Sequence, residues 1–219
     1  MSHAEAPLGL RERKHRRTKA AIQRAAAELT LETGFQGATI SRIAARAEIS
    51  PRTVSGYFAG KDEIFFTDVP DLMGRFSAFM ADGQGGAVDR IEQWIAGEAD
   101  RVRADEAGLD EAERAQEGEL RGLIHRAIVS DPELRAKEAQ LFESLGAGLA
   151  AAFAAEAGLA PTDFGPQLFA ATTLGAFGEI RARSMPGQEE LGLDDIRVAL
   201  DFLRAGAATL TAKGGAKAS

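Results

Sequence analysis

The segment TISRIAARAEISPRTVSGYF, residues 39–58, contains two amphipathic stretches of barely two helical turns each, separated by a turn. In the first stretch, apolar residues recur at helical spacing: Ile40, Ile43, Ala44 and Ala47. The second begins at Ser50-Pro51, because an N-cap hydroxyl followed by proline at the first helical position is a strong start signal. Isolated helices this short are marginal in water, so both must pack against a longer element.

That longer element is the helix predicted immediately upstream. It ends at Gly34, and Phe35 stands where a capping motif places its hydrophobic contact. Val54 and Phe58 of the last short helix are expected to face inward, so its other side faces solvent. The upstream helix contributes an apolar face made of Ile22, Ala25, Ala26 and Leu29. This is the helix-turn-helix arrangement, which presents one helix to the major groove of DNA.

The composition favours helices along the whole chain. Hydrophobic residues make up 45% of the 219 residues, and there are only 7 prolines and one tyrosine. Ala, Leu, Arg and Glu are plentiful while Val and Ile are sparse, a bias that favours helix over sheet. We therefore predict an all-α protein.

Several functional classes are excluded by what the chain lacks. It has no cysteine, which rules out disulfides, thiolate metal sites and a cysteine nucleophile. Three histidines, His3, His15 and His125, are too scattered to suggest a metal site. There is also no phosphate-binding glycine loop and no nucleophile motif, so we predict neither an enzyme nor a bound metal or cofactor.

Nothing in the sequence predicts a membrane partner. No apolar segment follows the basic N-terminus, so we do not expect a secretory signal. The longest weakly polar run, residues 145–155, is well short of the ~18 residues needed to span a bilayer. We therefore expect a cytoplasmic protein.

Charge is distributed unevenly. Residues 1–61 hold 11 Lys+Arg against 5 Asp+Glu, whereas residues 62–219 hold 15 against 28. The asymmetry indicates a basic module that meets a polyanion, joined to an acidic body that does not, although chance clustering on solvated faces remains the alternative. The stretch RERKHRRTK (residues 11–19) is either an arm that contacts DNA or a solvated tail that only steers association.

Long helices are predicted beyond Lys61, over 61–81, 88–107, 110–130, 132–157, 162–184 and 193–212. The predicted domains are a DNA-binding domain with the start of a linker helix over 14–75, and a second domain over 76–212. Residues 1–13 and 213–219 are predicted to be disordered.

The segment RAAAELTLETGFQGATISRIAARAEISPRTVSGYFAGKDEIF, residues 24–65, resembles the DNA-binding segment of the tetracycline-repressor (TetR) family. The matching elements are Gly34-Phe35, Thr39, Ile43-Ala44, Ser50-Pro51, Tyr57-Phe58 and Lys61. The resemblance implies an all-α homodimer: an N-terminal three-helix helix-turn-helix DNA-binding domain, then a C-terminal helical bundle for ligand binding and dimerisation. It further implies a repressor that a small molecule releases from a double-stranded DNA operator.

The predicted DNA contacts follow from the motif. Arg52 and Thr53 lie in the first turn of the recognition helix, where base edges are reached, and Arg suits a bidentate contact to guanine. The predicted set also includes residues at the start of the second helix and residues that match positions where the TetR family commonly contacts phosphate. The predicted set is Thr39, Arg42, Arg52, Thr53, Ser55, Gly56, Tyr57 and Lys61. For Arg52 the alternative is an ordinary solvated side chain, and for Tyr57 it is core packing.

Two positions depart from the family pattern. Glu48 stands where the family usually has glycine in the turn, so we expect a non-glycine residue at positive φ if the turn geometry is kept. Ser55-Gly56 stands where the family usually carries a large side chain. One account of Gly56 is that it lets the backbone approach the groove closely.

The second domain is expected to enclose a largely apolar ligand, because aromatic residues gather there. Arg121 and His125, one helical turn apart, are candidates for its polar anchor, with a surface face as the alternative. The predicted ligand-binding set is Phe76, Phe79, Trp94, Arg121, His125, Phe142, Phe169 and Phe177.

A dimer seam is predicted in the last helix. Its apolar residues step by four and three: Ile196, Leu200, Leu203, Ala207 and Leu210. Packing within one chain is the alternative. The leading functional interpretation is a ligand-released repressor, and the alternative is a constitutive helical DNA-binding protein without a ligand. The sequence does not identify the ligand, the operator or the target genes, and it does not separate repressor from activator.

Overall fold

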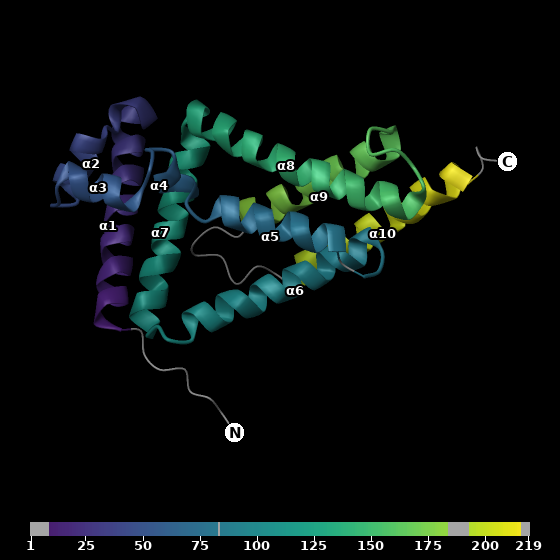
Figure 1. Ribbon diagram of the computed structural model, residues 1–219, viewed down its shortest axis with the longest axis horizontal. Coiled ribbons are helices and arrows are strands. Elements are labelled where there is room, and N and C mark those ends of the chain that lie inside the picture. Colours follow the sequence, from purple (N-terminus) through teal and green to yellow (C-terminus); the bar gives the residue numbers. More distant parts are fainter. Residues whose placement is uncertain (1–8, 83, 184–192, 216–219) are drawn as a thin grey trace, which may run out of the picture. The chain divides into compact units, whose positions relative to one another are not determined.

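The computed structural model describes residues 9–82, 84–183 and 193–215. Within these ranges every regular element is an α-helix, which confirms the predicted fold class (Figure 1). The first helices are α1 (Leu10–Gly37), α2 (Ile40–Arg46), α3 (Pro51–Tyr57), α4 (Glu63–Phe66) and α5 (Val69–Asp82). They are followed by α6 (Ala87–Glu106), α7 (Glu111–Ser130), α8 (Pro132–Ala157), α9 (Phe164–Arg183) and α10 (Leu193–Gly215).

The chain divides into two compact units. The first comprises Met1–Val69 and Arg101–Ala139, and the second comprises Pro70–Asp100 and Gln140–Ser219. The helix-turn-helix segment therefore shares a unit with α7. The functional boundaries at residues 14, 75 and 212 stay predictions.

Helix α1 is longer at its start than the sequence suggested. It begins at Leu10 and includes the whole basic stretch 11–19. Residues 10–13 and 213–215, which we predicted to be disordered, are helical, while residues 1–8 and 216–219 lie outside the described ranges. No proline or glycine interrupts the chain between Gly9 and Gly34, and Arg16 forms an ion pair with Glu117 of α7, so the helix continues through the basic stretch.

Near the other end of α1, Gly34 has a positive φ of 74° and interrupts the helix before one further turn. Side chains without this freedom avoid such backbone geometry, which explains the glycine. The core beneath α1, α2 and α3 includes Ile22, Ile43 and Val54, each 0% exposed. The two short helices thus gain their stability from α1, as their length requires.

The single helix predicted over 61–81 is wrong. The structure has α4 and α5 instead, interrupted at Thr67 and Asp68. Pro70 supplies the reason, because its ring would clash with the carbonyl of Phe66 and it has no N–H for a helical hydrogen bond. The remaining long helices lie within three residues of the predicted ranges.

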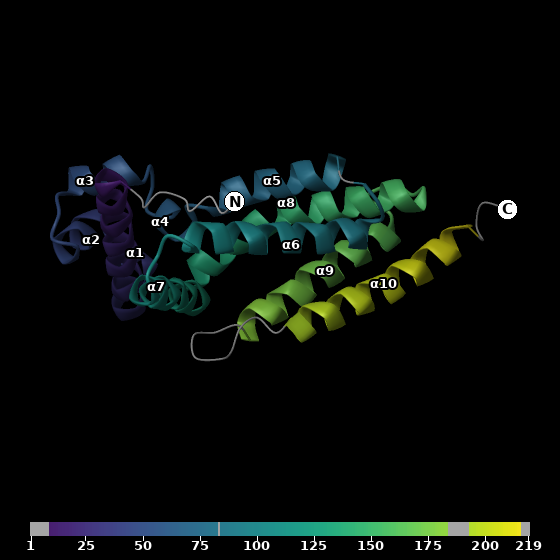
Figure 2. The ribbon, with the colours of Figure 1, turned by 90° about the horizontal axis from the view of Figure 1, so that it is seen from below.

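Apolar side chains from α5, α6, α8, α9 and α10 form the core of the second unit. Phe153 is 0% exposed and stacks on Phe169 with ring centroids 4.6 Å apart. Figures 1 and 2 show α9 and α10 side by side. Within the described residues, no helix is both long enough and apolar enough to cross a membrane.

The stripe predicted as a dimer seam lies in this core. Leu200, Leu203 and Ala207 are buried among side chains of their own unit, at 4%, 2% and 8% exposed. The alternative of packing within one chain is therefore correct for these residues. Both sides of α10 carry apolar residues, and the side with the leucines is the one covered by its neighbours.

Candidate nucleic-acid interface

The recognition helix α3 is fixed at its start by local polar contacts. Ser50 is its N-cap, and the Ser50 hydroxyl oxygen accepts a hydrogen bond of 3.0 Å from the backbone N–H of Thr53. The Thr53 hydroxyl lies 2.8 Å from the same oxygen. Such a cap stabilises a helix by ~1 kcal/mol, a large share for an element of 7 residues. The hydroxyl of Thr53 is thus engaged within the chain.

One face of α3 is open. Arg52, Ser55 and Gly56 are exposed and lie three and four residues apart, hence on one side of the helix, whereas Val54 is fully buried. The Arg52 guanidinium has no hydrogen bond or ion pair with any described residue. This face has the residues and the exposure that a groove-reading helix requires.

Helix α2 is held against α1 by two arginines. Thr39 caps α2 through the backbone N–H of Arg42, and the Arg42 guanidinium donates to the carbonyl of Gly37 at 2.6 Å. Arg46 donates to both carboxylate oxygens of Glu32, at 2.6 and 2.8 Å. Sequence reasoning missed this bidentate pair, which lowers the pKa of Glu32 and raises that of Arg46, chiefly through the hydrogen bonds.

The turn between α2 and α3 contains the expected backbone geometry. Glu48 has a φ of 55° and is the sole non-glycine residue at positive φ in the described ranges. The prediction of an unusual backbone at Glu48 is therefore confirmed.

Two aromatic contacts surround the end of α3. The Tyr57 ring stacks on His15 of α1, with centroids 4.6 Å apart and planes 27° apart. The Lys61 ammonium donates to the Phe35 carbonyl at 2.6 Å and lies 3.9 Å from the centre of the Phe35 ring. Burial lowers the pKa of Lys61, and this outweighs the negative charges of Glu133 and Asp131, which raise it. Lys61 thus connects the start of α4 to the end of α1, and its phosphate contact stays a prediction.

The end of α1 is also anchored to the junction of α7 and α8. One carboxylate oxygen of Asp131 accepts a hydrogen bond of 2.8 Å from the backbone N–H of Phe35. Its other oxygen accepts from the N–H groups of Glu133 and Leu134, at 2.9 and 3.2 Å. Asp131-Pro132 has the pattern of a helix start, but no local signal announces the contact with Phe35.

The ionised form of Asp131 is favoured by these contacts. Partial burial raises the pKa of this carboxyl group. The backbone hydrogen bonds from Phe35, Leu134 and Glu133 lower it, as does the nearby charge of Lys61, and together they outweigh the burial. The net pKa of Asp131 therefore lies below its ordinary value.

The geometry agrees with the comparisons with known proteins. The family described as bacterial regulatory proteins, tetR family, matches residues 22–67, and the MftR C-terminal domain family matches residues 102–208. The chain is 31% identical over 208 residues to the HTH-type transcriptional regulator TcmR of Streptomyces glaucescens, covering 90% of this chain and 87% of that protein. The chain belongs to the TetR family. It is therefore a DNA-binding transcriptional regulator and not an enzyme.

Two solved structures resemble this TetR-family chain in fold. A TetR-family transcriptional regulator from Mesorhizobium loti MAFF303099 has a TM-score of 0.50 at 19% identity, covering 90% of this chain and 98% of the other. A transcriptional regulator from Pseudomonas aeruginosa PAO1 has a TM-score of 0.52 at 20% identity, covering 90% and 91%. Because TetR-family membership implies an operator and an effector, both kinds of partner apply here.

The residues predicted for the effector site fall into two groups. Phe76 and Phe169 are buried in the core of the second unit, and further members pack against that core. Those further members are Phe79, Trp94 and Phe177. The rings of Trp94 and Phe76 meet edge to face, with centroids 5.4 Å apart. Phe142 is half-buried on α8.

Arg121 and His125 belong to the first unit, whereas the aromatic residues of the predicted site on α5, α6 and α9 belong to the second, and their role as a polar anchor stays a prediction. Arg121 is exposed and donates to Glu106 at 3.2 Å, as in the surface alternative. Sequence reasoning missed Arg90, which is 7% exposed and donates to the carbonyls of Met80 and Ala152 in the second unit.

Proposed function

We propose that this TetR-family regulator is a repressor that reads a near-palindromic operator as a homodimer and leaves it when a small, largely apolar ligand binds the second unit. The observation that carries the proposal is the open face of α3, with Arg52 exposed and unpaired among the described residues. An arginine in the first turn of a recognition helix is placed to form a bidentate contact with guanine. The phosphate contacts proposed for Thr39, Arg42, Tyr57 and Lys61 would set the register.

Gly56 supports a close approach between α3 and DNA. A Cβ atom at Gly56 would have nothing within 4 Å, so packing inside the chain does not require glycine there. Glycine inside a helix costs about 1 kcal/mol relative to alanine. Gly56 weakens the short helix α3 and has no packing reason to be glycine. A close approach of the α3 backbone to the DNA groove would explain it, because glycine has no side chain to block that approach.

A dimer would cover an apolar surface of the second unit. Phe164 and Leu168 of α9 are 78% and 41% exposed, and Val198 and Phe202 of α10 are 68% and 63% exposed. Each pair is four residues apart, so each forms a stripe on one side of its helix. Stripes of large apolar side chains mark association sites, and two-fold pairing of α9 and α10 would bury them.

The aromatic core of the second unit supports an apolar ligand. Trp94 of α6 contacts two rings of α5 there, Phe76 in an edge-to-face arrangement and Phe79 in a tilted one. An apolar effector that separates these side chains would change the packing of α5 against α6. The alternative function, a constitutive regulator without a ligand, predicts that this core never opens.

The operator test compares Arg52→Ala with Gly56→Ala. Arg52→Ala should change the ranking of operator variants, because it removes a base contact. Gly56→Ala should raise the melting temperature yet weaken operator binding, because the added methyl group meets the groove. Affinities are measured by fluorescence anisotropy at one fixed salt concentration. Unchanged ranking and unchanged affinity in both variants would refute the proposed reading face.

The dimer test is Phe202→Glu, with Ala208→Glu as the matched control. Both positions are exposed on α10, but only Phe202 lies in the apolar stripe. Phe202→Glu should give a monomer by analytical ultracentrifugation and lose operator binding, while circular dichroism still reports the helical fold. Ala208→Glu should stay dimeric. A dimeric Phe202→Glu variant would place the interface elsewhere.

The ligand test uses naphthalene as an uncharged aromatic probe. Binding in the second unit should raise the melting temperature and lower operator affinity in the same concentration range. If naphthalene and a panel of longer apolar compounds all leave both quantities unchanged, the constitutive alternative is favoured.

A further inference from the structure

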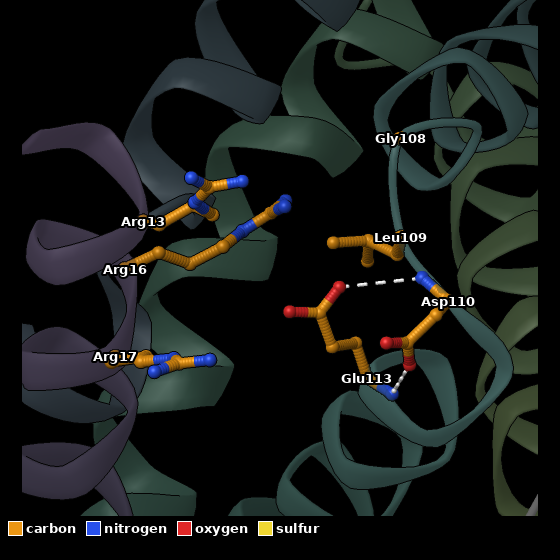
Figure 3. Close-up of a pocket in the computed structure, with 7 residues that line it drawn as sticks. All are labelled: Arg13, Arg16, Arg17, Gly108, Leu109, Asp110 and Glu113. Carbon is orange, nitrogen blue, oxygen red and sulfur yellow. Dashed lines mark hydrogen bonds between the residues drawn. The ribbon is translucent and has the colours of Figure 1, made fainter. Parts of the chain in front are cut away.

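The basic stretch 11–19 lies on the first turns of α1 and divides into two stripes on different sides of that helix. Arg13, Arg16 and Arg17 form the first stripe, which faces α7 and the turn before it. Figure 3 shows the three side chains pointing toward Leu109, Asp110 and Glu113 across a cavity of about 250 Å³.

This first stripe lies beside carboxylates of its own unit. Arg16 forms an ion pair of 3.2 Å with Glu117, and Arg24, two turns further along the same side, approaches Glu119 at 4.0 Å. Asp110 and Glu113 add two more carboxylates at the start of α7. Arg16 is therefore paired, whereas Arg13 and Arg17 form no ion pair with any described residue but line the same cavity as Asp110 and Glu113. The positive charge of this stripe thus faces carboxylates of its own unit.

The second stripe has a different neighbour. It consists of residues at the helical spacing i, i+3, i+4 and i+7, which places them on one side of α1: Arg11, Lys14, His15 and Thr18. His15 stacks on Tyr57, the last residue of the recognition helix. Arg11 and Lys14 are exposed and form no ion pair with any described residue. Glu12, also exposed, is the acidic residue nearest in sequence.

We propose that Arg11 and Lys14 bind the phosphate backbone of duplex DNA beside the groove that α3 enters, and that His15 is a positioning residue for this surface. The proposal rests on the proposed operator binding. If the open face of α3 lies in a major groove, the stack of Tyr57 on His15 places the second stripe next to the adjoining phosphates. Charge complementarity selects the occupant, because two cations that have no ion pair among the described residues, beside the proposed recognition helix, match a polyanion.

These contacts would add affinity without sequence preference. Phosphate contacts fix register and orientation but do not read bases. Each phosphate neutralised contributes a slope of about −0.9 to a plot of log K against log salt concentration on B-DNA. The second stripe is therefore measurable as a salt dependence, separately from the base preference that Arg52 is proposed to provide.

The experiment compares two double variants of the full-length protein that lose the same charge from the same helix. Arg11→Gln/Lys14→Gln removes the cations of the second stripe, and Arg13→Gln/Arg17→Gln removes two of the first. The first variant should flatten the salt slope by up to about 1.8 units per protomer, whereas the second should leave it close to the wild-type value. Neither should change the ranking of operator variants.

Equal flattening by both variants would overturn the proposal, because it would show that only overall charge matters. No flattening by Arg11→Gln/Lys14→Gln would overturn it as well. A wild-type protein that binds no operator at all would instead refute the proposed function. Circular dichroism and melting temperatures confirm that both variants are folded at the temperature of the titration.

His15 is tested by rescue. His15→Ala removes the ring that stacks on Tyr57 and should weaken operator binding, whereas His15→Phe keeps a stacking ring and should restore it. Both should keep the wild-type melting temperature within a few degrees. If His15→Phe binds as weakly as His15→Ala, or if neither differs from wild type, the positioning role is wrong.

Discussion

The two compact units are stabilised in different ways. In the first unit, short helices pack on the apolar face of α1 and are also fixed by directional polar contacts, such as the Ser50 cap of α3 and the hydrogen bonds of Lys61 and Asp131 to Phe35. In the second unit, long helices meet through apolar and aromatic side chains, with Phe153 at the centre. The first unit must hold a recognition helix of 7 residues in one orientation, and hydrogen bonds specify orientation better than apolar burial does.

The second unit has the opposite requirement under the proposed function. Apolar packing is non-directional and tolerates exchanges that conserve volume, so a core of this kind can rearrange around a ligand. Arg90 is the exception, because its guanidinium donates to the carbonyls of Met80 in α5 and Ala152 in α8. It therefore cross-links α6 to two neighbouring helices within an otherwise apolar region.

The largest expected loss of folding stability comes from Phe153→Ala, which tests the apolar packing of the second unit. The side chain is 0% exposed and stacked on Phe169, so its loss removes apolar burial and leaves a cavity. Substitutions of this kind cost about 3–5 kcal/mol. Chemical denaturation should show this loss, while Phe153→Leu, which fills more of the space, should cost less. A cost below about 1 kcal/mol would show that the core is loosely packed around Phe153.

A middle-sized effect is expected from Asp131→Ala in the first unit. It removes the cap of α8 and leaves the N–H of Phe35 without its acceptor. Losing a charged hydrogen-bond acceptor costs about 1.5–3 kcal/mol. The matched control is Asp110→Ala, since Asp110 caps α7 but has no side-chain partner beyond that helix start among the described residues, and it should cost about 1 kcal/mol. Equal costs for both would mean that the contact with Phe35 contributes nothing.

The same carboxyl group predicts a dependence on pH. The pKa of Asp131 is lower in the folded state than in the unfolded chain, so the folded state favours the ionised form. Its contribution is complete above the unfolded pKa of about 3.9 and is lost as the pH falls through the lower folded value. The stability difference between wild type and Asp131→Asn should therefore shrink in acid. A difference that is constant from neutral pH to pH about 3 would contradict this assignment.

Sequence reasoning succeeded where the determining signal is local. Thr39, Ser50-Pro51 and Gly34 each act within a few residues of their own position, and the structure shows the caps and the positive φ that they predict. It failed where the outcome depends on distant neighbours. Asp131 lies 96 residues from Phe35 in the chain, and no pattern around either residue announces the contact.

The faces of the last helix show the same limit. Leu200 and Leu203 lie on one side of α10, and Val198 and Phe202 lie on another, so its apolar pattern alone does not select the buried side. The choice depends on which helices cover α10. For the candidate DNA interface, the open face with Arg52, Ser55 and Gly56 was predictable from helical spacing, whereas the contact of Lys61 with Phe35 was not.

The smallest predicted effect is a gain of stability at Glu48 in the first unit. This residue occupies the left-handed region, with φ at 55°, where a side chain is strained and glycine is not. Glu48→Gly should therefore stabilise the protein by up to about 1 kcal/mol, because glycine relieves the strain. The gain is smaller than this limit to the extent that glycine gives the unfolded chain more conformational entropy.

Glu48→Ala is the matched control for the turn. It removes the carboxylate but keeps a Cβ atom at the same positive φ, so it should not stabilise the protein. The two melting temperatures, measured side by side, separate backbone strain from side-chain contacts. If Glu48→Gly and Glu48→Ala are destabilised equally, the Glu48 side chain makes a contact that outweighs the strain. If only Glu48→Gly is stabilised, the turn stores strain that the first unit tolerates because α2 and α3 are anchored by Arg46 and Ser50.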